Sequence, residues 1–289
     1  MKTWICRQLG WLFFLFSCSL YGQESPVLIV YPQVEEPLHR IYASIIQGIE
    51  HKVSDTELLE LPEGTHDAQG ELDRLHPKKI IALGKKVADT VHKSSYRGQT
   101  LVGMVHSTPS EAAGVSLALD SRDFAKRLTQ FAPFIKRVFV VQEHTHPAIT
   151  SKHVDSGSTP AIIIREGGDM TATIRLLGHL VEEEATTSDA VLIPANLPSN
   201  IFYEIAKIAW DRKIILLSTN LAHLESGVLM ALYPDPEGLG EQLGMLSNSG
   251  KFEFENLKAV TVGLNQRVAQ HLNIEIEASK LELFSVKLK

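Results

Sequence analysis

Hydrogen-bonding side chains and glycines stand directly after many of the short apolar runs of this sequence. Gly84 permits a close approach of the backbone, and the free N–H groups of a helix beginning at Lys85 would favour an anion. Asn196 carries both a donor and an acceptor, and Tyr233 would stack on a ring. The full set of predicted contact residues is Gln33, Gly84, Lys85, Ser107, Thr108, His144, Asn196, Ser218, Tyr233 and Asp235.

Several of these residues also have a purely structural interpretation. Glycine after a strand is typical of a turn, and Ser107 and Thr108, which precede a proline, are typical of a cap or a turn. Tyr233 would pack beneath a chain crossing, and Asp235 would cap a helix that begins at Pro236. The sequence leaves both interpretations open at these positions.

Three histidines, His144, His146 and His153, fall in one polar stretch, and neutral imidazole is a common zinc ligand. Their spacing does not match a helical i, i+4 pair, so the sequence favours a solvated loop and predicts no metal site. Among catalytic motifs, there is no Gly-x-Ser-x-Gly, no Gly-x-x-x-x-Gly-Lys and no His-Glu-x-x-His. The run Glu182 to Glu184 is typical of a solvated helix face. We therefore expect neither an enzyme nor a cofactor.

The N-terminus has the pattern of an export signal. Lys2 and Arg7 precede the apolar run Leu9 to Phe16, and a small, polar series follows to Gln23. The apolar run is about half of the ~20 residues that a membrane-spanning helix needs. The prediction is a signal peptide over residues 1–23 and a periplasmic location.

Both cysteines, Cys6 and Cys18, lie in this predicted signal. Ordinary cleavage after it leaves a chain with neither a disulfide nor a thiolate nucleophile. The alternative is a lipoprotein, because residues 15–18 resemble a degraded lipobox that would lipidate Cys18.

The charge is mildly acidic. The formal net charge is −6, and it becomes −8 without Lys2 and Arg7. Since no basic stripe is present to replace the counterions of phosphates, nucleic acid is not an expected partner.

Apolar runs rich in β-branched residues alternate with amphipathic stretches along the whole chain, which predicts parallel sheets covered on both faces. The expected strands are 27–31, 56–61, 79–83, 100–105, 114–119, 138–142, 161–165, 190–194, 214–217, 227–233 and 259–263. The expected helices are 35–49, 67–75, 85–92, 121–131, 170–184, 199–211, 236–246 and 265–272. Asp120 and Ser121 are the expected N-caps of the fourth helix. The fold class is therefore α/β, with two doubly wound lobes joined by a multi-strand hinge over a cleft.

The segment Thr108 to Val141 resembles the ABC-transporter substrate-binding proteins of the type that includes tryptophan and tyrosine binders. It contains Gly114-Val115, Ala132-Pro133 and Lys136-Arg137-Val138 in the family's order. The segments 227–244 and 262–276 are similar to the family's late strand–turn–helix and closing pattern, with Asn273 where glycine is usual. The Ala195-Asn196 pair departs from the family's Thr-Asp turn.

The resemblance implies a type I periplasmic-binding-protein fold, with residues 26–119 plus 229–257 in lobe one and residues 120–228 plus 258–289 in lobe two. It implies a monomer that captures a small molecule, amino-acid-like in character, and delivers it to an inner-membrane ABC permease. The alternative is an extracytoplasmic sensory protein that binds a ligand and acts on an envelope receptor, kinase or synthase without transport.

Overall fold

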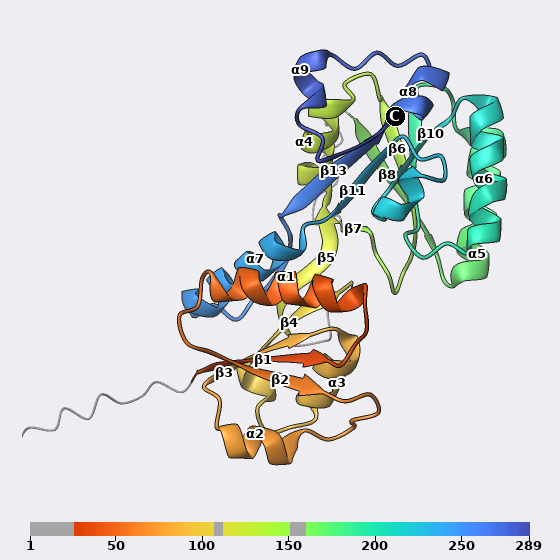
Figure 1. Ribbon diagram of the computed structural model, residues 1–289. Coiled ribbons are helices and arrows are strands. Elements are labelled where there is room, and N and C mark those ends of the chain that lie inside the picture. The colour runs from red at the N-terminus through yellow and green to blue at the C-terminus, as the bar shows by residue number, and fades with distance from the viewer. Residues whose placement is uncertain (1–25, 107–111, 151–159) are drawn as a thin grey trace, which may run out of the picture.

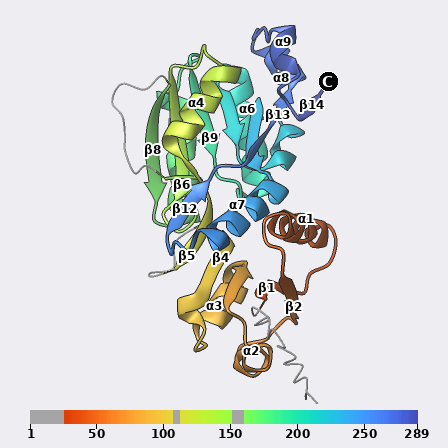
Figure 2. The ribbon, with the colours of Figure 1, turned by 90° about the vertical axis from the view of Figure 1, so that its left-hand side faces the viewer.

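The computed structural model describes residues 26–106, 112–150 and 160–289. Two α/β lobes lie end to end and meet at a narrow waist (Figures 1 and 2). Each lobe is built on its own seven-stranded sheet. Among the described residues, none of the helices has the length and hydrophobicity needed to span a bilayer.

Lobe one contains the first sheet, in which every pairing is parallel. Its strand order is β12-β5-β4-β3-β1-β2, and β7 also pairs with β5. The strands are β1 (Val27–Pro32), β2 (Thr56–Leu61), β3 (Lys79–Leu83), β4 (Thr100–Val105), β5 (Ala113–Asp120), β7 (Ile149–Thr150) and β12 (Phe254–Leu257). The helices are α1 (Leu38–Glu50), α2 (Gln69–Leu75), α3 (Lys85–His92) and α7 (Pro236–Ser249). The central strands β1 and β3 are buried on both faces, as their continuous apolar runs predict.

Lobe two contains the second sheet, in the order β14-β13-β11-β10-β9-β6-β8. Its pairings are parallel except that β11 and β13 run antiparallel. The strands are β6 (Arg137–Glu143), β8 (Ala161–Gly167), β9 (Asp189–Ile193), β10 (Ile215–Ser218), β11 (Met230–Pro234), β13 (Val260–Asn265) and β14 (Val286–Leu288). The helices are α4 (Ser121–Phe131), α5 (Met170–His179), α6 (Ser199–Arg212), α8 (Gln266–His271) and α9 (Ala278–Leu281), and a π-helical turn over Leu180–Glu184 continues α5.

The predicted fold class is confirmed, but two strands lie in the other lobe. One is β7, which was expected in lobe two within residues 120–228 and pairs with β5 in the first sheet. The other is β11. The expected boundary placed residues 229–257 in lobe one, whereas β11 pairs with β10 and β13 in the second sheet. The helix α7 and the strand β12 that follow do belong with lobe one, where β12 pairs with β5. The chain therefore returns to lobe one after Pro234. An apolar strand is equally suited to either sheet, so its sequence did not determine its partner.

The chain passes between the lobes after β5, after β11 and after β12, and it also reaches back to lobe one at β7, so neighbouring segments form the waist. The backbone N–H of Asp235 donates to the carbonyl of Ala259 at 3.1 Å, which joins two of these passages. Asp120 is the last residue of β5, where the chain first enters lobe two. It caps α4 as predicted, since its carboxylate accepts from the N–H groups of Arg122 and Asp123. Passages lying side by side are suited to a hinge.

Helices α1 and α7 cover one face of lobe one and pack tightly against each other (Figure 1). Glycines permit this contact, because a Cβ on Gly48 would overlap the carbonyl of Glu237 and one on Gly240 would overlap the carbonyl of Ile45. Both backbones therefore approach as closely as their atoms allow.

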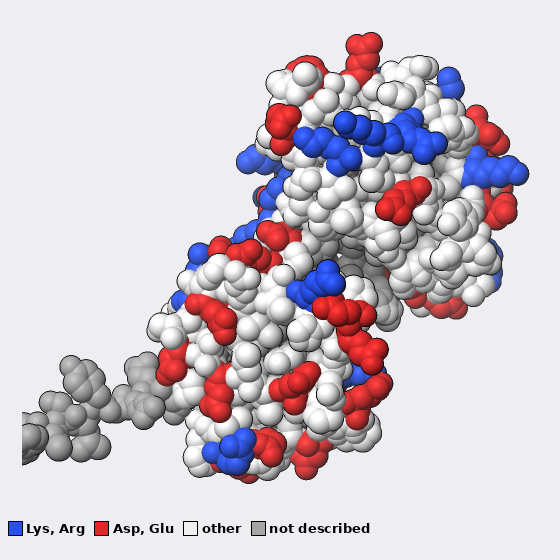
Figure 3. Space-filling view, viewed as in Figure 1, with Lys and Arg blue, Asp and Glu red and all other residues white. Residues whose placement is uncertain are grey.

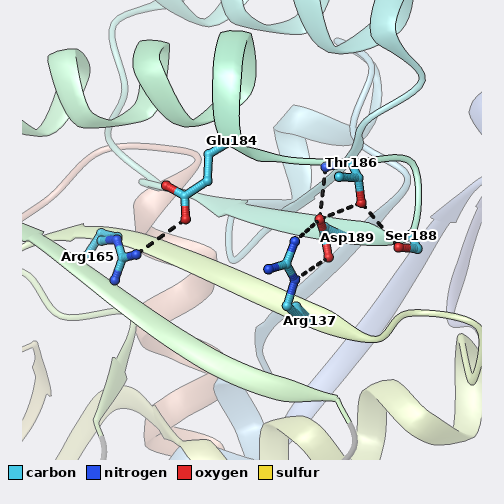
Figure 4. Close-up of polar contacts among 6 residues, drawn as sticks. All are labelled: Arg137, Arg165, Glu184, Thr186, Ser188 and Asp189. Atoms are coloured by element: carbon cyan, nitrogen blue, oxygen red, sulfur yellow. Dashed lines mark hydrogen bonds and ion pairs between the residues drawn. The ribbon is translucent and has the colours of Figure 1, made fainter.

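An ion pair between a half-exposed arginine and a buried carboxylate joins the first residues of β6 and β9 in lobe two (Figure 4). Asp189, which is 1% exposed, accepts two hydrogen bonds from the Arg137 guanidinium at 2.8 and 2.7 Å. The N–H and hydroxyl of Thr186 also donate to this carboxylate, at 2.9 and 2.7 Å. Burial alone would raise the pKa of Asp189, but the hydrogen bonds from Arg137 and Thr186 outweigh it and lower the pKa.

Candidate functional site

A groove of about 820 Å³ lies at the carboxyl edge of the first sheet, where β1, β2 and β3 end. Its walls are the β1–α1 connection over residues 32–38, the β2–α2 connection over residues 60–65, and the start of α3. In Figure 3 the molecule is hollowed between the lobes, on the side toward which β1 and β2 run in Figure 1. Ligands of open parallel sheets bind at this edge.

The start of α3 forms the positively charged end of the groove. Gly84 has φ +92° and holds the N-cap position without a capping side chain, so among the described residues no side chain satisfies the first N–H groups of α3. Lys85 and Lys86 lie on the same wall and are exposed. A helix N-terminus with cations beside it favours a carboxylate or another anion, as the sequence predicts for Gly84 and Lys85.

Carboxylates form the opposite wall. Glu60 at the end of β2 and Glu63 in the turn after it line the groove and are exposed. Tyr42 lies at the floor, and its ring centroid is 6.5 Å from that of Tyr31. Burial raises the pKa of Tyr42, while burial and the charge of Glu60 raise the pKa of Tyr31, so both phenols stay neutral hydrogen-bonding groups at neutral pH.

The second sheet presents a polar edge toward the same hollow, since its parallel strands run toward lobe one (Figure 2). At the end of β6, Glu143 accepts a hydrogen bond from the Asn196 side chain at 3.0 Å. His144 lies beside the Glu166 carboxylate, with 3.5 Å between Nδ1 and Oε2. Asn196 and His144 are both exposed at this edge.

The buried side chain of Gln142 holds the loop that follows β6. Its Oε1 accepts from the N–H groups of Ala148 and Ile149 at 3.0 and 3.1 Å. Its Nε2 donates to the Ile149 carbonyl at 3.2 Å and to Glu166 at 3.0 Å. One amide thus orders residues 143–149 and the carboxylate that contacts His144.

Ser218 has a structural role in this conformation. It is fully buried, its Oγ lies 2.8 Å from Nδ1 of His223, and it accepts from the N–H of Asn220 at 2.9 Å. Burial lowers the pKa of His223, so this imidazole is neutral at neutral pH. Asn220 also donates to the carbonyl of Ala195 at 3.0 Å, which joins the ends of β10 and β9. The exposed polar groups at this edge are supplied by the neighbouring strands.

Tyr233 and Asp235 lie at the waist, as their position in the sequence predicts. Burial and the charge of Asp235 raise the pKa of Tyr233, and a hydrogen bond with Thr261 opposes this shift. Asp235 occupies the N-cap position of α7, but its side chain makes no capping hydrogen bond with a described residue. The capping role considered for this side chain is therefore not realised.

The structure brings several of the predicted contact residues to two facing edges. Ser218 is buried instead, and Tyr233 and Asp235 lie at the waist. Gln33, Gly84 and Lys85 line the groove of lobe one, and His144 and Asn196 lie on the edge of lobe two. Ser107 and Thr108 fall outside the described residues.

The acidic members of both edges are absent from the predicted set. They are Glu35, Glu36, Glu60, Glu63, Glu143 and Glu166. Each lies at or just beyond a strand end, which is the signal that identified the other contact residues.

Comparison with known proteins identifies the fold. No family model matches the sequence, and no curated protein matches it. Solved structures do match, and three of them do so over 91% of this chain and 100% of the other. They include a substrate binding protein with adhesive properties from Clostridium difficile in its ligand-free, open form, at 15% identity and a TM-score of 0.57.

Two further solved structures match over the same extent. One is an ABC domain from Streptococcus pneumonia in complex with L-Trp, at 14% identity and a TM-score of 0.54. The other is a conserved domain protein from Vibrio cholerae, at 13% identity and a TM-score of 0.50. At these identities the likeness concerns the fold alone, and that fold is of the type I periplasmic-binding-protein kind.

Proposed function

We propose that this protein is an extracytoplasmic binding protein that captures a small solute between its two lobes. One observation carries the proposal: the parallel strands of both sheets run toward the hollow between the lobes (Figures 1 and 2), and a groove of about 820 Å³ is already formed at the carboxyl edge of the first sheet. That volume is within the usual range for small-molecule sites, about 300–1,000 Å³. Closure about the waist would add the edge of lobe two and remove the solute from water.

The arrangement of charge in the groove favours an amino-acid-like solute. Lys85 and the first N–H groups of α3 suit a carboxylate, whereas Glu60 and Glu63 on the facing wall suit an ammonium group. A zwitterion would satisfy both walls at once. An uncharged sugar would leave the charged groups of both walls partly desolvated without a charged partner, at a cost in binding free energy.

Such a protein acts by binding its solute more tightly in a closed form than in an open form, and no covalent step takes place. The export signal predicted at residues 1–23 supports a location outside the cytoplasm, and the resemblance of the sequence to ABC substrate-binding proteins supports delivery to an inner-membrane permease. On this proposal the closed, loaded form is the one that the permease recognises.

A thermal-shift screen of the processed protein tests the proposal. Amino acids, nucleosides, sugars and oxyanions are added separately in buffer with a chelator, and we expect an amino acid to raise the melting temperature. The absence of any stabilising solute, or a hit confined to sugars, would refute the assignment.

Matched variants then locate the site. Lys85→Ala should weaken binding about tenfold, whereas Lys93→Ala, at the other end of α3, should leave binding unchanged. Glu60→Gln should likewise weaken binding, and Glu57→Gln, at the start of the same strand, should not. Equal effects within either pair would place the solute elsewhere.

A further inference from the structure

Two histidines that are distant in sequence lie together at the waist. His106 directly follows β4 of lobe one, and His146 lies in the loop that follows β6 of lobe two. Their ring centroids are 5.8 Å apart and their planes are inclined by 55°. The rings are therefore close without being stacked.

Among the described residues, one nitrogen atom of His106 has no hydrogen-bond partner. Nδ1 is buried and makes no hydrogen bond with a described residue. An unpaired polar atom in such a position costs free energy, and a ligand bound there would remove that cost. On His146, Nδ1 lies 3.0 Å from the Thr145 hydroxyl, while the ring as a whole is exposed. The pair is thus accessible from solvent on the side of His146.

The spacing of the two rings suits a shared metal ion. Zinc binds imidazole nitrogen at about 2.0–2.1 Å, which places each ring centroid roughly 3 Å from the ion. Two such rings at a tetrahedral angle have centroids roughly 5 Å apart. The observed separation is close to this value, so a small side-chain rotation would bring both rings onto one ion.

We propose that His106 and His146 form a two-imidazole site for a borderline divalent transition-metal ion such as Zn²⁺, with water in the remaining coordination positions. The ion would connect the end of β4 to the β6–β7 loop, where the two lobes meet. This proposal does not depend on the solute proposed above, whose screen is run with chelator present.

The loop geometry keeps the second imidazole in place. Gln142 binds the N–H groups of Ala148 and Ile149, and β7 pairs with β5 through Ile149 and Leu119. His146 is thereby held near His106 before any ion binds, which reduces the entropy cost of binding.

A second cluster of ligand atoms provides an internal control. His51, Glu237 and Glu241 have ligand atoms within 4.8 Å of one another where α1 meets α7. There, however, Lys52 Nζ already lies 3.2 Å from Glu241 and would compete with a cation.

Zinc titration of the processed, metal-free protein at pH 7.5 tests the proposal, by calorimetry and by thermal shift. We expect one equivalent to bind and the melting temperature to rise. His146→Asn should lose this rise and bind zinc at least about tenfold more weakly. His144→Asn in the same loop and His51→Asn in the other cluster should behave like the wild type. Because His146 is exposed, its replacement should leave the fold intact.

Imidazole ¹⁵N chemical shifts supply a readout that does not depend on stability. Zinc should shift the Nδ1 resonance of His106 in the wild type and leave it unchanged in His146→Asn. Wild-type protein that binds no zinc, His146→Asn that binds it normally, or loss of binding in His51→Asn would each overturn the proposal.

Discussion

The hydroxyl oxygen of Tyr42 stands 3.0 Å from the position that a Cβ would occupy on Gly84. This relationship ties α1 to the turn between β3 and α3 at the floor of the groove. Gly84 has φ +92° and ψ 152°, a combination that is essentially confined to glycine. Both the backbone and the space above it therefore require glycine where the first N–H groups of α3 meet the groove.

Gly84→Ala should therefore lower both stability and solute affinity. The backbone conformation should cost about 1–3 kcal/mol of unfolding free energy, and relief of the strain would turn the N–H groups of α3 away from the solute. Urea denaturation and solute titration measure the two effects. Gly250→Ala is the control, because its φ of +70° is also positive but nothing lies within 4 Å of its added Cβ. Gly250→Ala should lose about 1 kcal/mol of unfolding free energy and retain full affinity for the solute. A loss of solute affinity in Gly250→Ala would contradict this interpretation.

Asp189→Asn should destabilise lobe two. The variant leaves the Arg137 guanidinium without its buried partner and removes the ionic hydrogen bonds. Because Arg137 is 44% exposed and partly hydrated, the expected loss is about 2–3 kcal/mol, below that of a fully buried pair. Denaturant unfolding gives the value. Glu184→Gln removes the more exposed ion pair with Arg165, at 3.4 Å, and should change stability by less than about 0.5 kcal/mol.

The same carboxylate should make stability depend on pH. The folded-state pKa of Asp189 lies below its unfolded value of about 4, so its contribution is complete above that value and disappears as the pH falls through the folded pKa. The difference in unfolding free energy between wild type and Asp189→Asn should be constant from pH 5 to about pH 8 and should shrink below about pH 4. A difference that persists at pH 2 would show that charge does not cause it.

Gln142→Met should disorder the loop after β6. The replacement is similar in size and remains buried, but it leaves the N–H groups of Ala148 and Ile149 without acceptors. We expect a loss of about 2–4 kcal/mol and faster hydrogen exchange at these two amides. Gln270→Met on the exposed face of α8 should change neither property. Unchanged exchange in Gln142→Met would mean that other contacts hold the loop.

The sequence predicted most elements of the fold because each has a strong local pattern. The observed bounds of β2, β3, α3, β4 and α4 match the expected ones. In each case an apolar run or a helical period ends at a clear turn or cap, as Asp120 shows for α4. Such signals are contained within a few residues, so they can be read without knowledge of the tertiary structure.

The missed elements depend on partners that are distant in the chain. The strands β7, β12 and β14 have two to four residues each, and they exist because β5 and β13 offer free edges to them. Such short segments have too few residues to show a period. The assignment of β11 to lobe two was missed for the same reason, since pairing rather than composition decides it.

Local sequence position predicted only part of the candidate site. Position after a strand identified Gly84 and Asn196, because all carboxyl ends of parallel strands meet at one edge. The contact between His106 and His146 could not be inferred, since β4 and the β6–β7 loop lie on different lobes. Only the folded chain shows that the histidine-rich loop has a partner outside itself.

The crossing of α1 and α7 provides the most severe test of the packing in lobe one. Gly240→Ala would place a Cβ against the carbonyl of Ile45, a backbone atom that no side-chain rotation can move. The two helices would have to separate along their contact, and we expect a loss of more than about 3 kcal/mol, measured by thermal and urea unfolding. Gly178→Ala in α5 has the same helical setting with nothing within 4 Å, so it should stabilise the protein by up to about 1 kcal/mol. If the same Gly→Ala replacement lowered the unfolding free energy at position 240 and raised it at position 178, backbone contact and not helix propensity would be the reason for glycine at position 240. If Gly240→Ala were also neutral or stabilising, the close approach of α1 and α7 would be wrong.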